Sequence, residues 1–535
     1  MSLSRSEIGL IKGLLRLGCS QQEVIAAFSH PSRTIHHNLI SDIARGVRYG
    51  DEAKYPVAKV PELLEFMFCR GWEKRLDWID KSIWFWLDDP YLRFRYSYHP
   101  VGQGIFCSGF ITRKGKDPYR WVFDCGTERG KSSTKNGDRV RREIMALASE
   151  QASPGSSGPR PRLDLVALSH FDEDHLSGMV DLLRTFSVDT FLLPYLSHWD
   201  SIVVALEEGA GAGSDLLGFL LDPSGFLRGI EGVEIERILM VPPTGEGPAA
   251  EPLTPPEDID PDGTSSGFSE VVWKADPLKE YDDPNASDHD LAGELQSSYG
   301  NVEVLRPGQV ITVDRTWEFV PYNDASLAGL ATTKFKSDAR DLVGQLLKAK
   351  TDADRKMALD GLTTIYDAQF KTPRSTKISA ERRNKISLFL YSGPIGDVEL
   401  EWAAQHTLRH RLEPVRSAVP VEWLTSDRFG QMFTGDGYLN TAKQWQDFEG
   451  FYRPHGRLQR AAFFQVMHHG SRANWRHGIA AKLSPCASIF CSDPAGKLGH
   501  PDEPVLMDFA PYNPKQVDAF HGWSIRGAYR FRSNA

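Results

Sequence analysis

The chain has 535 residues, of which 25% are charged and 41% are hydrophobic, and its formal net charge is −9. That length exceeds one small core and predicts two or three domains. No apolar run of about eighteen residues appears, and the opening residues, MSLSR, do not resemble a signal peptide. We therefore expect a cytoplasmic protein that does not cross a membrane.

The net acidity argues against a polyanionic partner, but much of it lies in one segment, 246–290, and the remainder is close to neutral. The cysteines are scattered along the chain without zinc-finger spacing. Cys486 and Cys491 are close enough in sequence to pair, although small buried thiols are the interpretation that we favour. Scattered free thiols are typical of a reducing compartment.

Residues 1–60 predict three short helices separated by tight turns, at Arg5–Leu17, Gln21–Phe28 and Arg33–Ala44, each with apolar residues at helical spacing. The pattern indicates a helix-turn-helix-like module whose third helix would enter the major groove of DNA. The alternative is a small helical bundle used for homodimerisation or for docking another protein. The candidate nucleic-acid contacts lie near the start of the third helix and are Arg33, His37 and Asn38.

Residues 61–94 join this module to the rest of the chain and are rich in aromatic side chains, among them Phe66, Trp72, Trp78 and Trp84. An aromatic stripe at helical spacing is usually a core face, so we predict an aromatic helical connector. Stacking of nucleic-acid bases on these rings is the alternative.

The next segment predicts strands and a helix in close succession. Tyr98–Gly104 opens a hairpin that leads to an apolar strand at Trp121–Thr127, and that strand ends in Asp-x-Gly. A second apolar run, Leu163–Leu168, predicts a buried strand, and Met179–Phe186 predicts an amphipathic helix. The turn between this strand and this helix reads Ser-His-Phe-Asp-Glu-Asp-His-Leu-Ser-Gly.

This turn carries imidazoles and carboxylates at close spacing, at His170, Asp172, Asp174 and His175. A turn held between a rigid strand and a helix can present such side chains on one concave surface, which is what a metal site requires. The alternative is a polar surface loop whose side chains cap the following helix. We predict that the turn binds metal.

Two segments interrupt the pattern of strands. The first, at about 242–300, is rich in Pro, Gly and acidic residues and predicts a solvated loop. The second, at about 327–382, is charged and predicts helices at Ala339–Ala349 and Asp354–Phe370. We expect these insertions to rim the active-site groove and to shape substrate choice, with a solvent-facing decoration as an equal alternative.

Further polar motifs accompany strand-like segments toward the C-terminus. Asn384–Tyr391 and Phe463–His469 predict strands, and Phe433–Gly437 predicts a tight turn. The last motif is Gly-His-Pro at 499–501. The polar residues that these motifs carry are Asp436, His468, His469 and His500.

In chain order, the motifs are Val-Gly-Gln-Gly, Asp-x-Gly, His-x-Asp-x-Asp-His, Thr-Gly-Asp, His-His-Gly-Ser and Gly-His-Pro. This ordered set resembles the ComEC-like branch of the metallo-β-lactamase superfamily, a branch named for the hydrolase domain of a DNA-uptake protein. The resemblance covers roughly residues 95–510 and concerns the hydrolase module alone, without the membrane part of that protein. It departs from the superfamily signature at Asp172, which stands where a second His is usual.

The resemblance implies an α/β (α+β) fold for residues 95–535, namely a four-layer αββα sandwich with insertions. The helix-turn-helix-like module at 1–60 and the connector at 61–94 would precede it.

The resemblance also implies a centre of two divalent metal ions. His170 and Asp172 would serve one ion, Asp174 and His175 would serve the other, and Asp436 would bridge the two. Because a carboxylate at position 172 makes the first site harder, manganese follows closely behind zinc as the expected metal.

The remaining ligands stay open at this point. One of His468 and His469 would complete the set, and the other would orient a ligand or protonate a leaving group. His500 would lie at the mouth of the pocket and contact substrate. The superfamily's additional His ligand has no clear counterpart, and His198 is the candidate for it.

Together these features predict a metallohydrolase of phosphodiester bonds, specifically a nuclease that acts on DNA rather than RNA. One alternative is hydrolysis of a small phosphodiester, ester or amide, with the N-terminal module as a docking unit. Another is a DNA-binding regulator with a degenerate hydrolase fold. Stand-alone proteins that resemble this branch are often bacterial, and the resemblance carries the expectation of a phage-defence context. The expected catalytic residues are Asp174, Asp436, His469 and His500.

Overall fold

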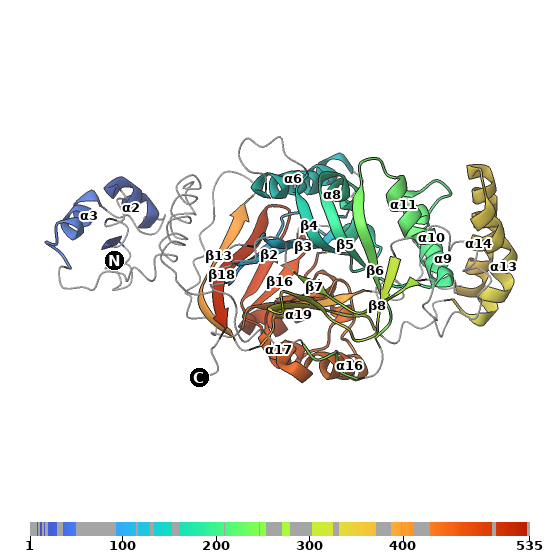
Figure 1. The fold of residues 1–535 in the computed structure, drawn as a ribbon. Coiled ribbons are helices and arrows are strands. Elements are labelled where there is room, and N and C mark those ends of the chain that lie inside the picture. The colour runs from blue at the N-terminus through green and yellow to red at the C-terminus, as the bar shows by residue number, and fades with distance from the viewer. Residues whose placement is uncertain are drawn as a thin grey trace.

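The structure is a computed structural model, shown as a ribbon in Figure 1. It describes residues 20–28, 36–49, 92–113, 116–128, 133–151, 160–207, 209–244, 247–252, 270–278, 302–324, 331–370, 387–396, 398–409, 428–494 and 499–531, together with Ile8, Ile11, Lys12 and Leu15. Arg33 and nearly all of the predicted aromatic connector lie outside these described residues.

The larger of two sheets has 10 strands. In order across the sheet they are β13 (Val398–Arg409), β18 (His521–Phe531), β1 (Leu92–Tyr98), β2 (Phe106–Arg113), β3 (Tyr119–Cys125), β4 (Arg162–Ala167), β5 (Ser187–Pro194), β6 (Glu234–Val241), β9 (Val302–Leu305) and β8 (Ala275–Pro277). The strands from β3 to β9 run parallel, and the others pair antiparallel. Parallel strands covered on both faces are largely apolar, as β4 is from Leu163 to Ala167 apart from Asp164.

The second sheet has 8 strands. In order they are β17 (Pro514–Val517), β16 (Ala487–Cys491), β15 (Ala461–Gln465), β14 (Gly430–Phe433), β12 (Phe389–Pro394), β11 (Trp317–Tyr322), β10 (Ile311–Val313) and β7 (Val271–Val272). The strands from β17 to β14 run parallel, and the rest pair antiparallel.

The two sheets face each other across an aromatic core. Tyr96 and Trp121 of the larger sheet meet Trp317 and Phe463 of the smaller one, with ring centroids between 5.7 and 6.4 Å apart. Large rings bury much apolar area per residue, so they contribute strongly to holding the sheets together. The polar ends of the central strands are thereby fixed relative to one another.

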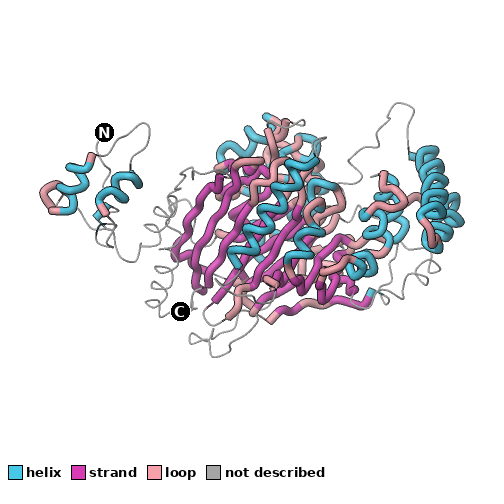
Figure 2. Tube along the Cα trace, turned by 90° about the horizontal axis from the view of Figure 1, so that it is seen from above, coloured by secondary structure: helices cyan, strands magenta, loops and turns pink. Residues whose placement is uncertain are grey.

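Helices cover the outer faces of both sheets, as Figures 1 and 2 show. Those that share a core with the larger sheet are α6 (Ser133–Gln151), α8 (Met179–Thr185), α9 (His198–Glu207), α10 (Asp215–Leu221), α11 (Pro223–Gly229), α13 (Thr333–Lys348) and α14 (Asp352–Phe370). Those that share a core with the smaller sheet are α16 (Ala442–Tyr452), α17 (Arg457–Arg460), α18 (Ile479–Leu483) and α19 (Glu503–Phe509). A capping box between Thr441 and Gln444 starts α16.

The mixed α/β architecture predicted from the sequence is confirmed. The strand predicted at 163–168 is β4, and the helix predicted at 179–186 is α8. In the N-terminal module, α2 (Gln21–Phe28) lies where a helix is predicted. The third helix, α3 (His37–Ala44), begins later than predicted because His36 has extended backbone angles. A helix-turn-helix that binds DNA stays a prediction.

The prediction of a solvated loop at 242–300 is wrong in part. Val271–Val272 pairs with β10, and Ala275–Pro277 pairs with β9. These strands are too short for hydrophobic periodicity and are stabilised by backbone hydrogen bonds to a neighbouring strand. The second insertion is helical as predicted, and its Phe335 ring lies 6.4 Å from Trp199 of α9.

Two strand boundaries also differ from prediction. β12 begins at Phe389 rather than Asn384, and the three residues from 384 to 386 lie outside the described part of the chain. β15 ends at Gln465, before the paired histidines.

In the described part of the chain, no disulfide joins Cys486 to Cys491, in keeping with the interpretation that we favour. Among the described residues, no helix combines the length and the apolar character that crossing a bilayer requires.

Candidate metal centre

The predicted metal-binding turn begins where β4 ends. The single helical turn α7 (Glu173–Leu176) carries Asp174 and His175. Asp172 occupies the N-cap position, but its side chain makes no capping hydrogen bond, so capping does not explain it. A Cβ atom on Gly126 would lie 2.5 Å from the backbone of Asp174 and of His175. The glycine of Asp-x-Gly therefore lets the end of β3 pack directly against this turn.

The carboxylate of Asp436 lies at the centre of the cluster and comes from the turn after β14. The Nε2 atoms of His175 and His469 are 3.2 and 3.8 Å from its Oδ1. The Nε2 atoms of His468 and His170 are 3.4 and 3.8 Å from its Oδ2. Four imidazoles from two separate segments thus face one buried carboxylate from a third.

Asp174 and Asp172 lie on two sides of this arrangement. Oδ2 of Asp174 is 2.8 Å from Nε2 of His469, and its Oδ1 is 3.9 Å from Nε2 of His175. Oδ2 of Asp172 is 3.9 Å from Nε2 of His170. His170, Asp172, Asp174, His175, Asp436, His468 and His469 are therefore brought together as predicted, whereas the candidate His198 is not among them.

Two groups of side chains have donor atoms close enough to hold one ion each. One group is His170, His175 and Asp436, and the other is Asp174, His175 and His469. His175 belongs to both groups, and Asp172, predicted to share an ion with His170, belongs to neither. Because Asp172 still lies 3.9 Å from His170, the predicted pairing of these two residues stays a prediction.

The backbone conformation of the paired histidines could not be predicted from their sequence. Met467–Gly470 forms a 3₁₀ turn, η8, in which His468 and His469 have φ of 45° and 58°. Left-handed backbone is uncommon for residues other than glycine and ends the strand at this point. It also brings both imidazoles toward Asp436, rather than one to each face of a strand.

Each histidine of the cluster has a hydrogen-bond partner at Nδ1. The partners are Ser169 Oγ at 2.9 Å for His170, Asp124 Oδ2 at 2.7 Å for His175, Asn474 Oδ1 at 2.7 Å for His468 and the Cys491 carbonyl oxygen at 2.6 Å for His469. Carboxylate and carbonyl oxygens can only accept, so Nδ1 carries the proton in these contacts. Nε2 is then the ring nitrogen that faces the carboxylates, and its lone pair would bind a metal ion once any proton on Nε2 is released.

Asp124 supports the cluster and was not selected from the sequence. It is fully buried and accepts hydrogen bonds from Ser169 N, Ser169 Oγ and His175 Nδ1, each at 2.7 Å. It therefore fixes two members of the turn at once. The available signal was its place in the Asp-x-Gly motif, which marks a strand end but does not show which side chain the carboxylate reaches.

The donor set fits a divalent metal centre. Nε2 of His170 and Nε2 of His175 are buried and have no hydrogen-bond partner among the described residues. Buried polar atoms are nearly always satisfied, so unpartnered atoms aimed at carboxylates indicate that a cation completes the site. Neutral imidazoles and carboxylates are ligands of Zn²⁺ and Mn²⁺.

Without metal, two imidazoles of the cluster, His175 and His469, hold their protons more tightly than a free imidazole does. Burial acts to lower the pKa of His469, but the carboxylates of Asp436 and Asp174 outweigh it and raise that pKa to about 9. The pKa of His175 is also raised, against burial, by its acidic neighbours. Burial opposes the shift of Asp174, yet His175 and His469 lower its pKa to about 2. A metal ion would replace these protons as the positive charge of the site.

The other predicted site residues have different places. The His500 ring lies 6.1 Å from that of His468, and burial together with His469 lowers the pKa of His500. His198 starts α9 and belongs to neither group of possible ligands in the described chain. His37 and Asn38 are exposed in the first turn of α3.

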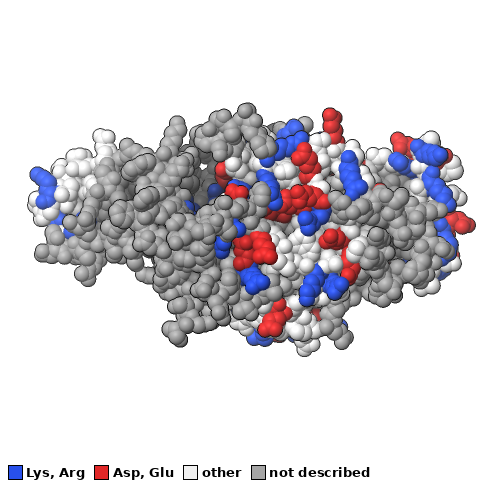
Figure 3. All heavy atoms as spheres, in the orientation of Figure 1, with Lys and Arg blue, Asp and Glu red and all other residues white. Residues whose placement is uncertain are grey.

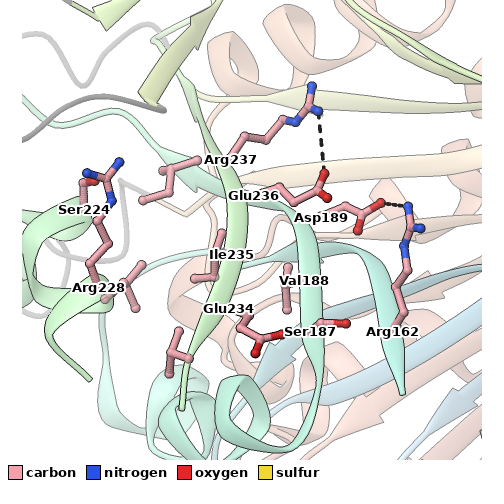
Figure 4. A pocket seen from close by; sticks show the side chains of 13 residues that line it. Arg162, Ser187, Val188, Asp189, Ser224, Arg228, Glu234, Ile235, Glu236 and Arg237 are labelled. Atoms are coloured by element: carbon pink, nitrogen blue, oxygen red, sulfur yellow. Dashed lines mark hydrogen bonds and ion pairs between the residues drawn. The ribbon is translucent and has the colours of Figure 1, made fainter. Parts of the chain in front are cut away.

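A separate pocket of about 500 Å³ lies at the opposite end of the parallel strands. Figure 4 shows its lining, with Arg162 paired to Asp189 and Arg237 paired to Glu236. Arg162 begins β4, whereas the metal-binding turn follows the end of that strand. The pocket is therefore not part of the metal centre.

A double variant tests whether the cluster binds metal. We expect Asp174→Ala with His175→Ala to contain almost no metal after purification in chelator-free buffer, whereas the unaltered protein is fully occupied. The reason is that both groups of ligands include His175. Inductively coupled plasma mass spectrometry measures the content.

The matched control replaces another close His–Asp pair, His521 and Asp518, whose side chains are 2.9 Å apart and outside the cluster. This control double alanine variant should keep full metal content. Equal content in all three proteins would contradict a metal centre at Asp174 and His175.

A scan of the chain against models of known protein families finds no match, and a search of curated proteins finds no similar one.

Proposed function

We propose that the protein is a metal-dependent hydrolase of phosphodiester bonds with a metallo-β-lactamase fold of the ComEC-like type. One observation carries the proposal: four imidazole Nε2 atoms and the carboxylates of Asp174 and Asp436 converge from strand ends of both sheets. The succession of helices, sheet, sheet and helices supports the four-layer sandwich that the resemblance implies.

Two divalent ions at this cluster would supply Lewis-acid activation of water and neutralise the charge of a phosphodiester. His170, His175 and Asp436 would hold one ion, and Asp174, His175 and His469 the other. Zinc is our first proposal, from the family resemblance. Manganese is the second, because the carboxylates make the donor set harder.

The chain's own side chains would then orient the reaction. Asp436 presents both carboxylate oxygens to the ligand histidines and so sets the spacing of the site. We propose that His500, whose ring lies 6.1 Å from that of His468, contacts substrate through a hydrogen bond. Burial together with His469 lowers its pKa, which favours the neutral form of the imidazole.

The substrate class rests on the family resemblance and on local charge. Arg472 and Arg476 are exposed on the loop directly after the paired histidines, where they could contact phosphates. In the described part of the face that Figure 3 shows, acidic and basic side chains are interspersed rather than arranged as a continuous basic track. Basic side chains close to the metal centre, rather than a broad positive electrostatic potential over the surface, would therefore attract a nucleic acid.

The decisive experiment is an activity panel. Metal-free protein is reconstituted with Zn²⁺ or Mn²⁺ and offered single- and double-stranded DNA, RNA, a chromogenic phosphodiester, an ester and an amide. The proposal expects cleavage of DNA and of the chromogenic phosphodiester, and loss of both in the Asp174→Ala, His175→Ala variant. Cleavage of the ester or amide alone would favour the small-substrate alternative. No cleavage with either metal would favour a DNA-binding regulator.

The N-terminal module is proposed as a DNA-binding unit. Deleting residues 1–60 should leave cleavage of the chromogenic phosphodiester intact and weaken binding of long DNA by at least about 10-fold, with a shallower dependence on salt. Fluorescence anisotropy at several salt concentrations measures both effects. Unchanged DNA affinity would leave the module as a docking or dimerisation unit.

A further inference from the structure

Asn474 links the two loops that carry the ligand candidates of the smaller sheet. It closes the short 3₁₀ turn η9 (Arg472–Asn474), which follows the paired histidines, and it is fully buried. Its side chain reaches both His468 and the backbone of the turn that holds Asp436.

The hydrogen bonds of Asn474 define the orientation of its amide. Nδ2 donates to the carbonyl oxygens of Asp436 at 2.7 Å and of Gly437 at 3.2 Å. Carbonyl oxygens only accept, so the amide nitrogen must face them and Oδ1 must face the other way. Oδ1 is 2.7 Å from Nδ1 of His468, which therefore donates to it.

This contact has a direct consequence for ligation. With the proton held on Nδ1, the lone pair of His468 is on Nε2, which lies 3.4 Å from Oδ2 of Asp436. His468 has a left-handed backbone and a side chain 21% exposed, so packing alone constrains its ring less than that of the buried His469. The amide of Asn474 supplies the missing constraint.

We propose that Asn474, anchored on the backbone of the Asp436 turn, is a positioning residue that orients the imidazole of His468 toward a metal ion. The inference rests on the proposed metal centre and adds His468 to its ligands. Hydrogen bonds to the non-ligating nitrogen of a ligand histidine typically change metal affinity by about 10- to 100-fold.

A merely structural role is distinguishable because other contacts also tie these loops. Asn440 Nδ2 donates to the carbonyl oxygen of Ala473 at 2.6 Å, and the backbone N of Arg472 donates to Asp502 at 2.8 Å. Asn440 thus joins the same two loops as Asn474 without touching a ligand histidine. Asn440→Ala is therefore the matched control.

The test measures metal binding to the full-length protein. Metal-free protein is titrated with Zn²⁺ and with Mn²⁺ by calorimetry, and its unfolding temperature is recorded. We expect Asn474→Ala to weaken one of two binding events by about 10- to 100-fold and to leave the other unchanged. Asn440→Ala should bind both ions as the unaltered protein does. Asn474→Leu, which keeps the side-chain volume, replaces Asn474→Ala if the latter does not fold.

A double-mutant cycle then asks whether Asn474 acts through His468. In a His468→Ala background, Asn474→Ala should cause no further loss of affinity, since the ligand that it orients is gone. Equal losses for Asn440→Ala and Asn474→Ala, unchanged affinity in Asn474→Ala, or losses that add in the double variant would each overturn the inference. If the unaltered protein binds neither ion, the proposed metal centre itself fails.

Discussion

Asp436→Asn is expected to lower the rate of hydrolysis at least about 1,000-fold, equivalent to about 4 kcal/mol of activation free energy, while the protein remains folded. The substitution keeps the size of the side chain and removes the negative charge that four imidazoles face. The backbone N of Asp436 donates to Ser387 Oγ at 2.8 Å, and this hydrogen bond does not depend on the carboxylate. The value of kcat/KM for the chromogenic phosphodiester, together with circular dichroism, measures both expectations.

The matched control for this variant is Asp508→Asn. Asp508 is also a buried carboxylate near the cluster in sequence, but it accepts from Trp475 Nε1 and Gly478 N and faces no ligand histidine of the centre. Its substitution should change stability and leave the rate within a few-fold of that of the unaltered protein. If Asp436→Asn retains more than about a tenth of the activity, a difference of about 1.4 kcal/mol, Asp436 does not organise the centre.

The ligand candidates could be predicted because their signal is local. His170, Asp174 and His175 follow one apolar strand, and the residue types alone indicate metal binding. Their supporting residues could not be predicted in the same way. Asp124 contacts His175 across a separation of 51 residues in the chain. Which strand ends meet is decided by sheet order, which hydrophobic periodicity does not specify.

The same limit explains the paired histidines. An apolar run followed by two histidines predicts one continuous strand, in which neighbouring side chains would point to opposite faces. Instead, the amide oxygen of Gln465 accepts from the backbone N of Thr434 at 2.8 Å and of Gly435 at 2.9 Å. These contacts tie the end of β15 to the Asp436 turn, and the 3₁₀ turn η8 begins soon afterwards at Met467. The tertiary contact overrides the local pattern.

The elements of the fold were predictable to different extents. Buried strands such as β4 are recognisable because burial on both faces leaves a largely apolar run, which in β4 is interrupted by Asp164. The edge strands β7 and β8 are not, because they lie in an acidic, Pro-rich segment and depend on hydrogen bonds to β10 and β9. Helices α13 and α14 were recognisable because their apolar residues recur at helical spacing and pack on each other and on α9.

The metal-free protein is expected to lose stability as the pH rises from about 6.5 to above 9. The pKa of His469 in the folded protein is about 9, above the ordinary value of 6.5. A group whose pKa is raised by folding contributes stability that is complete below its unfolded value and is lost as the pH passes through its folded value. A difference of this size corresponds to about 3 kcal/mol of the free energy of unfolding.

The ion pair between His469 and Asp174 also determines how the stability of the metal-free protein falls at low pH. The pKa of Asp174 is lowered to about 2 by His175 and His469, so its contribution is present above the ordinary value of 3.8 and is lost as the pH falls toward 2. Because His469 and Asp174 are partners in one interaction, the stabilisation is counted once. The contribution of His469 and Asp174 to the stability of the metal-free protein is therefore greatest between about pH 4 and 6.5.

Urea unfolding of chelator-treated protein at pH 6 and at pH 9.5 measures how much of the free energy of unfolding is lost as the pH rises. His469→Ala provides the reference, because it lacks the shifted imidazole and should show a smaller difference between the two pH values. Saturating Zn²⁺ or Mn²⁺ should stabilise the unaltered protein more at pH 9.5 than at pH 6, since a ligand imidazole must first release its Nε2 proton. An equal pH dependence in the unaltered protein and in His469→Ala would show that this imidazole is not held protonated by Asp174 and Asp436.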